Sequence, residues 1–168
     1  ALLLAYGAGL RANEIDKARW DWIKEEGHSC FIQIPDEQGD FRPKGGEGRL
    51  VRIQREVLDA LVKSRNTASP YIIGGNEPSG KAASGLAYRS PDTFRKINLW
   101  LRDRGVEKGK ARGHPLHTLR KQYGSVIATQ HGLFHAQHLL GHKSPVVTSK
   151  YYSSPTMVPE LTHFKIVG

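Results

Sequence analysis

The chain has 168 residues and a formal net charge of +9 at pH 7, because 25 lysines and arginines outnumber 16 aspartates and glutamates. This length fits a single domain that can bury a hydrophobic core. The positive charge favours a polyanionic partner such as nucleic acid, although charge alone leaves a merely basic protein equally open. A single cysteine, Cys30, excludes an internal disulfide and fits a reducing compartment. No apolar run reaches the ~18 residues of a membrane span.

The N-terminal part of the sequence predicts two short helices. Residues 2–6 are apolar with helical character, but no basic segment precedes them, so they do not read as a signal peptide. They are typical of a helix interrupted at its start, and we expect the chain to begin inside a longer protein. A second helix is predicted over residues 11–17, with Arg11 and Glu14 on one face.

A small antiparallel sheet is predicted to follow. Residues 20–23 alternate between apolar and polar, which indicates a half-buried strand or an extended connection with both tryptophans in the core. Strands are expected over residues 30–34, 41–44 and 48–53, separated by turn sequences rich in glycine and aspartate. Lys44 would then lie near the tip of a hairpin.

The second half of the chain predicts mainly helices. Apolar spacing indicates helices over residues 54–65, from Pro91 to about residue 101, over 117–129 and over 133–140. Gly141 is expected to cap the last of these, and Pro145 to open another that carries Tyr151 and Tyr152. Residues 69–90 and the basic segment 102–114 read as loops, and the tail from residue 153 holds apolar residues that could pack on this domain. The predicted fold class is mixed α+β and mostly helical.

One stretch near the C-terminus carries the chemistry. His117 and Arg120 lie three residues apart, so on a helix they point at one target. A guanidinium matches phosphate oxygens in geometry and charge, and a neighbouring imidazole can move a proton. A tyrosine hydroxyl brought to the same place could attack phosphorus and form a covalent intermediate. Leu140-Gly141-His142 follows along the chain, with Tyr151 nine residues beyond the histidine, and the spacing of this whole set points to phosphoryl transfer.

These motifs resemble those of the tyrosine recombinases, the phage integrase family. His-x-x-Arg, Leu-Gly-His and a tyrosine nine residues later are similar to the C-terminal signature of that family, and the Gly-Leu-Arg-Ala-Asn-Glu sequence at residues 9–14 is similar to its first arginine box. Lys44, five residues before Arg49, resembles the lysine of the family's β-hairpin. The matching positions, in chain order, are Arg11, Lys44, His117, Arg120, His142 and Tyr151.

The resemblance implies a role for each of these residues. Arg11 and Arg120 would clamp the phosphate oxygens, Tyr151 would be the nucleophile and Lys44 the general acid. His117 would assist proton transfer at the tyrosine, and His142 would hydrogen-bond the phosphate. Glu14 would orient arginine, although a glutamate on a helix is also often a solvated charge. Many members carry histidine after the second arginine, where this chain has Lys121.

The resemblance also implies the surroundings of the reaction. The expected fold is the tyrosine-recombinase catalytic domain with a three-stranded antiparallel sheet, and residues 1–168 would form a C-terminal catalytic domain without the preceding core-binding DNA domain. Double-stranded DNA would be the partner, with tetramers on paired sites and weak or no assembly without DNA. No cofactor, metal or membrane is expected, and the location would be cytoplasmic, at a bacterial or phage-like nucleoid. Further DNA contacts are expected at Arg42, Arg49, Lys108, Lys110, Arg112, Lys121 and Lys143.

Three other interpretations remain open at this point. A type IB topoisomerase uses similar side chains, but the compact spacing between Leu-Gly-His and tyrosine favours a recombinase. A histidine-rich metal-binding module is suggested by His131, His135, His138 and His142, which follow one face of an ideal helix and could bind zinc. Gly132 and Gly141 interrupt that helix, and no cysteine completes a typical site. The third is a DNA-binding domain with degenerate catalysis, which ranks low because all six matching positions hold competent residues.

Overall fold

A computed structural model describes residues 1–76, 88–107, 114–144, 146 and 149. The elements, in chain order, are α1 (Leu2–Gly7), α2 (Ala12–Lys17), the 3₁₀ helix η1 (Trp20–Trp22), β1 (Ile23–Glu26), β2 (Ser29–Ile34), β3 (Arg49–Ile53), α3 (Arg55–Lys63), α4 (Pro91–Asp103), α5 (Pro115–His131) and α6 (Leu133–Leu140).

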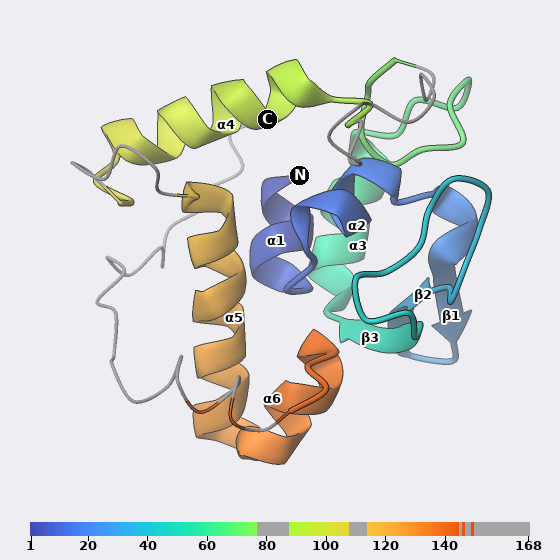
Figure 1. Cartoon of the computed structure of the whole chain (residues 1–168). Coiled ribbons are helices and arrows are strands. Elements are labelled where there is room, and N and C mark those ends of the chain that lie inside the picture. Colours follow the sequence, from blue (N-terminus) through green and yellow to red (C-terminus); the bar gives the residue numbers. More distant parts are fainter. Residues whose placement is uncertain (77–87, 108–113, 145, 147–148, 150–168) are drawn as a thin grey trace.

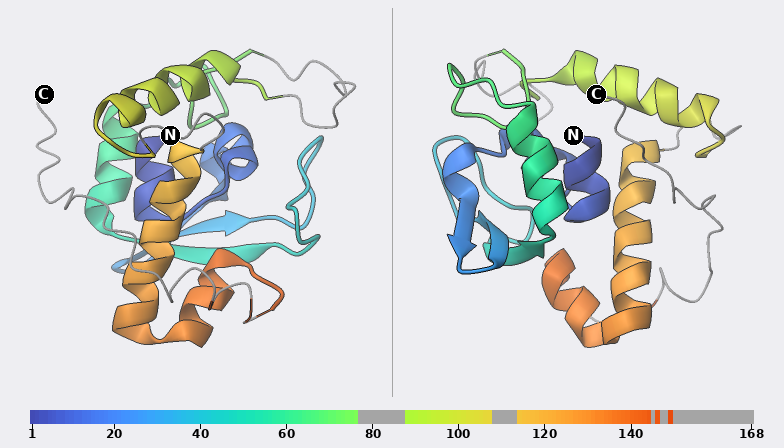
Figure 2. Two further views of the ribbon diagram at one scale, coloured as in Figure 1. Left: turned by 60° about the vertical axis from the view of Figure 1, so that its left-hand side comes forward. Right: turned by 180° about the vertical axis from the view of Figure 1, so that it is seen from behind.

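Helix α1 lies at the centre of the domain, where Leu4 and Ala5 are fully buried. Helix α5 runs along one side of α1 and α4 crosses above both, while the sheet and α3 lie on the other side (Figure 1). Helix α6 contacts both α5 and β3, and it lies below α1 between them (Figure 2). Helix α6 therefore links α5 to the sheet.

The sheet has three antiparallel strands in the order β1-β2-β3. On β2, Cys30, Ile32 and Ile34 are buried at alternating positions, so one face of the sheet packs on the core. In the register, Ile32 lies opposite Ile23 on one side and Val51 on the other. The predicted fold class, helical with a small antiparallel sheet, is confirmed.

The expected strand over residues 41–44 is wrong. Phe41 exchanges two backbone hydrogen bonds with Gln38, and a turn follows in which Gly46 N–H donates to Pro43 O (2.9 Å). Pro43 has no N–H with which to extend a strand ladder. The third strand is instead β1, which follows the tryptophans, and Lys44 lies in the long connection between β2 and β3.

The predicted helix boundaries in the second half agree closely with the structure. Helix α4 begins with Pro91 at its first position, and α6 ends at Gly141, whose left-handed conformation (φ 60°, ψ 49°) forms the cap. Of the helix expected after Pro145, the structure describes Val146 and Ser149, both helical. Tyr151, Tyr152 and the tail lie outside the described residues. Within the described part of the chain, no helix has the length and apolar character needed to cross a bilayer.

Candidate active site

Helix α2 begins with a hydrogen-bonded cap that brings Arg11 and Glu14 together. The Glu14 carboxylate accepts the backbone N–H of Arg11 (2.7 Å) and a bond from its guanidinium (3.1 Å), as in a capping box. Only 1% of the Glu14 side chain is exposed. This burial favours the orienting role for Glu14 over that of a solvated helix charge.

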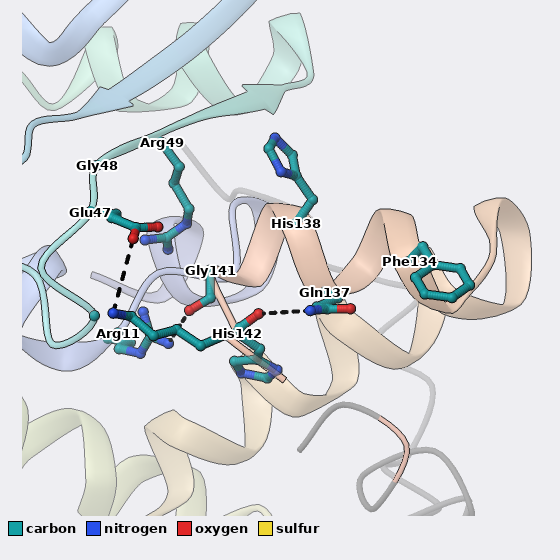
Figure 3. A pocket seen from close by; sticks show the side chains of 11 residues that line it. Arg11, Glu47, Gly48, Arg49, Phe134, Gln137, His138, Gly141 and His142 are labelled. Carbon is teal, nitrogen blue, oxygen red and sulfur yellow. Dashed lines mark hydrogen bonds and ion pairs between the residues drawn. The ribbon is translucent and has the colours of Figure 1, made fainter. Parts of the chain in front are cut away.

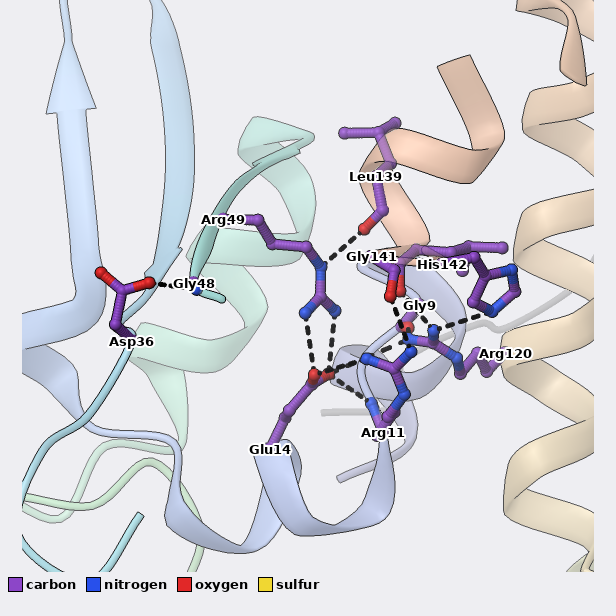
Figure 4. Close-up of polar contacts among 11 residues, drawn as sticks. Gly9, Arg11, Glu14, Asp36, Gly48, Arg49, Arg120, Leu139, Gly141 and His142 are labelled. Carbon is purple, nitrogen blue, oxygen red and sulfur yellow. Dashed lines mark hydrogen bonds and ion pairs between the residues drawn. The ribbon is translucent and has the colours of Figure 1, made fainter. Parts of the chain in front are cut away.

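Two further arginines approach the same carboxylate (Figure 4). Arg49 on β3 binds both oxygens of Glu14 with a two-pronged contact (2.8 and 2.9 Å), and Nη1 of Arg120 on α5 lies 3.9 Å from Oε2. Burial would raise the pKa of Glu14, but the hydrogen bonds and charge of Arg49, with the cations of Arg120 and Arg11, lower it to about 2. Glu14 is therefore ionised at neutral pH, and three cations against one anion leave the cluster with an excess of positive charge.

The C-terminal turn of α6 holds the same three guanidiniums. The last carbonyls of a helix lack partners within the helix and carry the negative end of its dipole. Here three successive carbonyls each accept a hydrogen bond from a different arginine (Figure 4). The bonds are Arg49 Nε to Leu139 O (2.8 Å), Arg120 Nη2 to Leu140 O (2.6 Å) and Arg11 Nη2 to Gly141 O (3.0 Å). The arginines are thus fixed both by a side-chain anion and by a helix terminus.

Arg120 is the most enclosed of the three, with 2% of its side chain exposed. It also donates to the carbonyl of Gly9, and its Nη2 lies 3.4 Å from His142 Nε2. Gly9 has a φ of +61°, and a Cβ at this position would lie 2.3 Å from the ring of Tyr123. Only glycine can therefore present this carbonyl to Arg120, which gives a physical reason for the glycine of the first arginine box.

Two histidines with depressed pKa values accompany the arginines. Desolvation, followed by the cations of Arg120 and Arg11, lowers the pKa of His142 to about 4. The pKa of His117 falls to about 4 by desolvation and the nearby cations Arg120 and Lys121, although the residue lies at the surface. Gln137 donates to the backbone carbonyl of His142 (3.0 Å) and steadies it. Both imidazoles are therefore neutral at pH 7, so each can donate one proton and accept another.

A pocket of about 350 Å³ opens beside this cluster, between the end of the β2–β3 connection and α6 (Figure 3). Lys143 lies at its rim, 4.0 Å from Glu47, and both side chains are exposed. The pocket is lined by Arg11, Gly45, Glu47, Gly48, Arg49, Phe134, Gln137, His138, Gly141, His142 and Lys143. Guanidinium and imidazole groups at its inner end suit an anion with several oxygens.

The structure brings several of the predicted site residues into one cluster. Glu14 forms ion pairs with Arg11 and Arg120, and Arg120 contacts His142. The charge of Arg120 also lowers the pKa of His117. Lys44 is exposed and immediately precedes the pocket-lining Gly45. Tyr151 lies outside the described residues.

The expected DNA-contact residues are distributed unevenly. Arg42 is 73% exposed and pairs loosely with Glu37 (3.7 Å), and Lys143 is 68% exposed. Lys121 is partly exposed on α5. Lys108, Lys110 and Arg112 lie outside the described residues.

Arg49 differs from this expectation, because its side chain is only 5% exposed and is bound inside the domain. Its guanidinium is already bound to Glu14 and to the carbonyl of Leu139. The sequence contained a signal for its burial: side chains alternate along a strand, so Arg49 shares a face with Val51 and Ile53, both buried. A cation on an inward face needs an anionic partner, and Glu14 is that partner.

The four histidines considered for zinc do not share one helix. Helix α5 ends at His131, and α6 starts after Gly132, which has a φ of 87°. The rings of His131 and His135 lie 5.6 Å apart, whereas His142 contacts Arg120. Across the residues that the structure describes, no group of three or more histidine, cysteine, aspartate or glutamate side chains could hold a metal ion.

Comparison with known proteins decides the family. Residues 1–157 match the phage integrase family. The chain belongs to this family. No curated relative matches the sequence.

Several solved structures share the phage integrase fold of this chain. XerH site-specific recombinase bound to difH substrate has a TM-score of 0.64 at 17% identity, over 89% of this chain and 41% of that one. A lambda integrase dimer bound to a COC′ core site has a TM-score of 0.59 at 20% identity, over 98% and 54%. The Tn1549 transposon integrase in complex with circular intermediate DNA has a TM-score of 0.57 at 19% identity, over 93% of this chain and 55% of that one. The chain thus spans about half the length of these proteins.

The pKa values of this integrase-family site predict that the protein loses stability in two successive pH ranges as the pH falls. Between pH 6.5 and 4 the histidines of the unfolded chain take up protons that folded His117 and His142 do not, so the free energy of unfolding should fall as the pH falls. Between about pH 4.5 and 2, Glu14 should cause a second loss, because its carboxylate is more acidic in the folded state. Urea unfolding at a series of pH values measures both.

Two variants show which residues cause the loss of stability in each pH range, and each variant is the control for the other. His142→Gln should reduce the pH dependence above pH 4 to the share that His117 contributes and leave the lower range unchanged, whereas Glu14→Gln should flatten only the lower range. An unfolding free energy that stays constant from pH 6.5 to 4 would contradict the histidine assignment.

Proposed function

We propose that this chain is the catalytic domain of a longer site-specific DNA recombinase that breaks and rejoins DNA through a 3′-phosphotyrosine intermediate. One observation carries the proposal: Arg11 and Arg120, which are far apart in the sequence, are fixed at one helix terminus beside the neutral imidazole of His142. Guanidinium forks match the oxygens of a phosphodiester, and fixed cations stabilise the charge that develops when phosphorus is attacked.

The proposed cleavage step combines the arginines and histidines of this cluster with Tyr151 and Lys44. The Tyr151 oxygen attacks phosphorus and the bond from phosphorus to the 5′ oxygen breaks. The neutral imidazole of His117 accepts the tyrosine proton, and Lys44 gives a proton to the leaving 5′ oxygen. Arg11 and Arg120 neutralise the phosphate, and His142 donates a hydrogen bond to it. A 5′ hydroxyl then reverses the step, so the strands rejoin without ATP.

The likeness to DNA-bound neighbours supports the proposed partner. XerH was solved bound to difH substrate and lambda integrase bound to a COC′ core site, and the basic composition of this chain suits double-stranded DNA. We propose that it assembles as a tetramer on paired sites, that it is weakly associated or monomeric without DNA, and that it works at a bacterial or phage nucleoid in the cytoplasm. The exposed Lys143 and Arg42 are proposed as backbone contacts.

Covalent trapping tests the proposed function. A nicked suicide substrate, which loses a short strand after cleavage, should leave a denaturation-resistant adduct between the full-length protein and the 3′ phosphate. EDTA should not prevent the adduct. Strand exchange between two sites then separates a recombinase from a topoisomerase. Cleavage that needs a divalent metal and leaves no protein on the DNA would contradict the proposal.

A further inference from the structure

The Arg49 side chain joins the two supports of the candidate site, which are Glu14 and the last turn of α6. We propose that Arg49 is a positioning residue that makes no contact with DNA and holds Arg11 and His142 in place through these supports. The inference rests on the proposed recombinase function and assigns a role that none of the six motif positions covers.

The first support is the carboxylate of Glu14. Arg49 binds one side of it with two parallel hydrogen bonds, while Arg11 binds Oε1 with its guanidinium and Oε2 with its backbone N–H. A carboxylate held from two directions cannot rotate. Arg11 is therefore fixed relative to β3, although 21% of its side chain remains open to the pocket.

Charge balance gives Arg49 a second effect through Glu14. This carboxylate is buried and ionised, so it must draw compensating charge from its neighbours. Arg49 supplies that charge from the side of the sheet. Without it, the guanidiniums of Arg11 and Arg120 would be attracted toward Glu14 and away from an anion in the pocket.

The second support is the end of α6. Nε of Arg49 donates to Leu139 O (2.8 Å), three residues before His142. A Cβ added at Gly141 would lie 3.1 Å from Cδ of Arg49 and 3.3 Å from its Nη1, so the guanidinium lies directly against the capping turn. The turn from which His142 emerges is thus attached to β3 by this side chain.

A DNA contact is the competing role, because Arg49 also lines the pocket, and variants of Arg49 separate the two roles. All three guanidinium nitrogens of Arg49 have partners inside the domain, and 5% of the side chain is exposed. Arg52, on the same strand three residues later, is exposed and serves as a matched control.

Arg49→Lys in the full-length protein tests the proposal, because lysine retains the charge but its single ammonium cannot span both Glu14 and Leu139 O. We expect covalent cleavage of the suicide substrate to slow by ~10²-fold, the loss typical of small misplacements of reacting groups. Duplex affinity and its salt dependence should stay within a factor of about two, since no phosphate contact is removed. Arg52→Lys should cleave at the normal rate.

A double variant shows whether Arg49 acts through Glu14. If Arg49 acts through Glu14, Arg49→Lys with Glu14→Gln should cleave no more slowly than the slower single variant, because both changes break one unit. If the two residues acted independently, the rate losses of the two single variants would multiply in the double variant. If Arg49→Lys fails to fold, Glu14→Gln alone carries the test and should slow cleavage while affinity is retained.

Amide hydrogen exchange provides a measurement that does not depend on the reaction. Arg49→Lys should speed exchange at the Gly141 and His142 amides, which close the last turn of α6 on His138 O and Gln137 O, while the β1–β2 ladder stays protected. The proposal is overturned if Arg49→Lys cleaves within a few-fold of the unmodified protein, or if its salt slope falls by about one, as for a lost phosphate contact. Unchanged exchange at these two amides would also overturn it. If the unmodified protein forms no adduct, the proposed function fails, and exchange alone then decides the role of Arg49.

Discussion

Tyr151→Phe is expected to abolish the covalent protein–DNA adduct and leave duplex binding intact. The substitution removes one hydroxyl, which is the proposed nucleophile, and the arginines, histidines and Glu14 of the cluster cannot form a stable phosphoester in its place. Folding should be unaffected, because the ring is retained. Gel analysis of the suicide-substrate reaction measures the adduct, and a duplex titration measures binding.

The neighbouring tyrosine provides the matched control. On the helix that the sequence predicts for this segment, successive residues would point about 100° apart, so only one of Tyr151 and Tyr152 could face Arg120 and His117. Tyr152→Phe should therefore still form the adduct, and peptide mass analysis should place the phosphotyrosine at Tyr151. An adduct at Tyr152, or one that persists in Tyr151→Phe, would reverse the assignment.

Arg11→Ala should slow cleavage by ~10²–10³-fold, the loss that follows removal of one donor to a developing oxyanion. DNA affinity should change little, because the other cations of this basic chain still hold the backbone. Single-turnover cleavage under saturating protein separates the two quantities. Arg52→Ala, which removes an exposed arginine of β3 with no proposed role, should leave the cleavage rate unchanged.

Removal of Arg120 should slow cleavage as removal of Arg11 does, but it should also destabilise the fold. Its removal leaves the carbonyls of Gly9 and Leu140 buried without a donor, at a cost of about 1–3 kcal/mol each. Arg120→Lys is the milder variant, and its unfolding midpoint should be measured beside its cleavage rate. If either arginine variant cleaves within a few-fold of the unmodified protein while binding is lost, these arginines serve to dock DNA.

Local features of the fold were predictable from the sequence, because short-range chemistry determines them. Gly141 ends α6 where helical spacing stops, and Pro91 starts α4 at the position where a missing N–H has no effect. The strand expected over residues 41–44 failed for a reason also present locally, since Pro43 cannot donate to a ladder.

The arrangement around Glu14 could be predicted only in part. The pairing of Arg11 with Glu14 follows from a spacing of three residues on a helix. The contacts of Arg49 with Leu139 and of Arg11 with Gly141 join residues 90 and 130 positions apart, and no local pattern encodes such a distance. The strand register placed Arg49 on a buried face, but only the tertiary structure identifies its partners.

The three arginines bound to the end of α6 also determine when the site can form during synthesis. The guanidiniums of Arg11 and Arg49 emerge from the ribosome long before the carbonyls that hold them, because those carbonyls belong to residues 139 and 141. Contacts of such long sequence separation form late, after most of the chain entropy has been lost. An incomplete nascent chain therefore has no assembled phosphate clamp, and a translation product that stops before α6 should leave DNA intact.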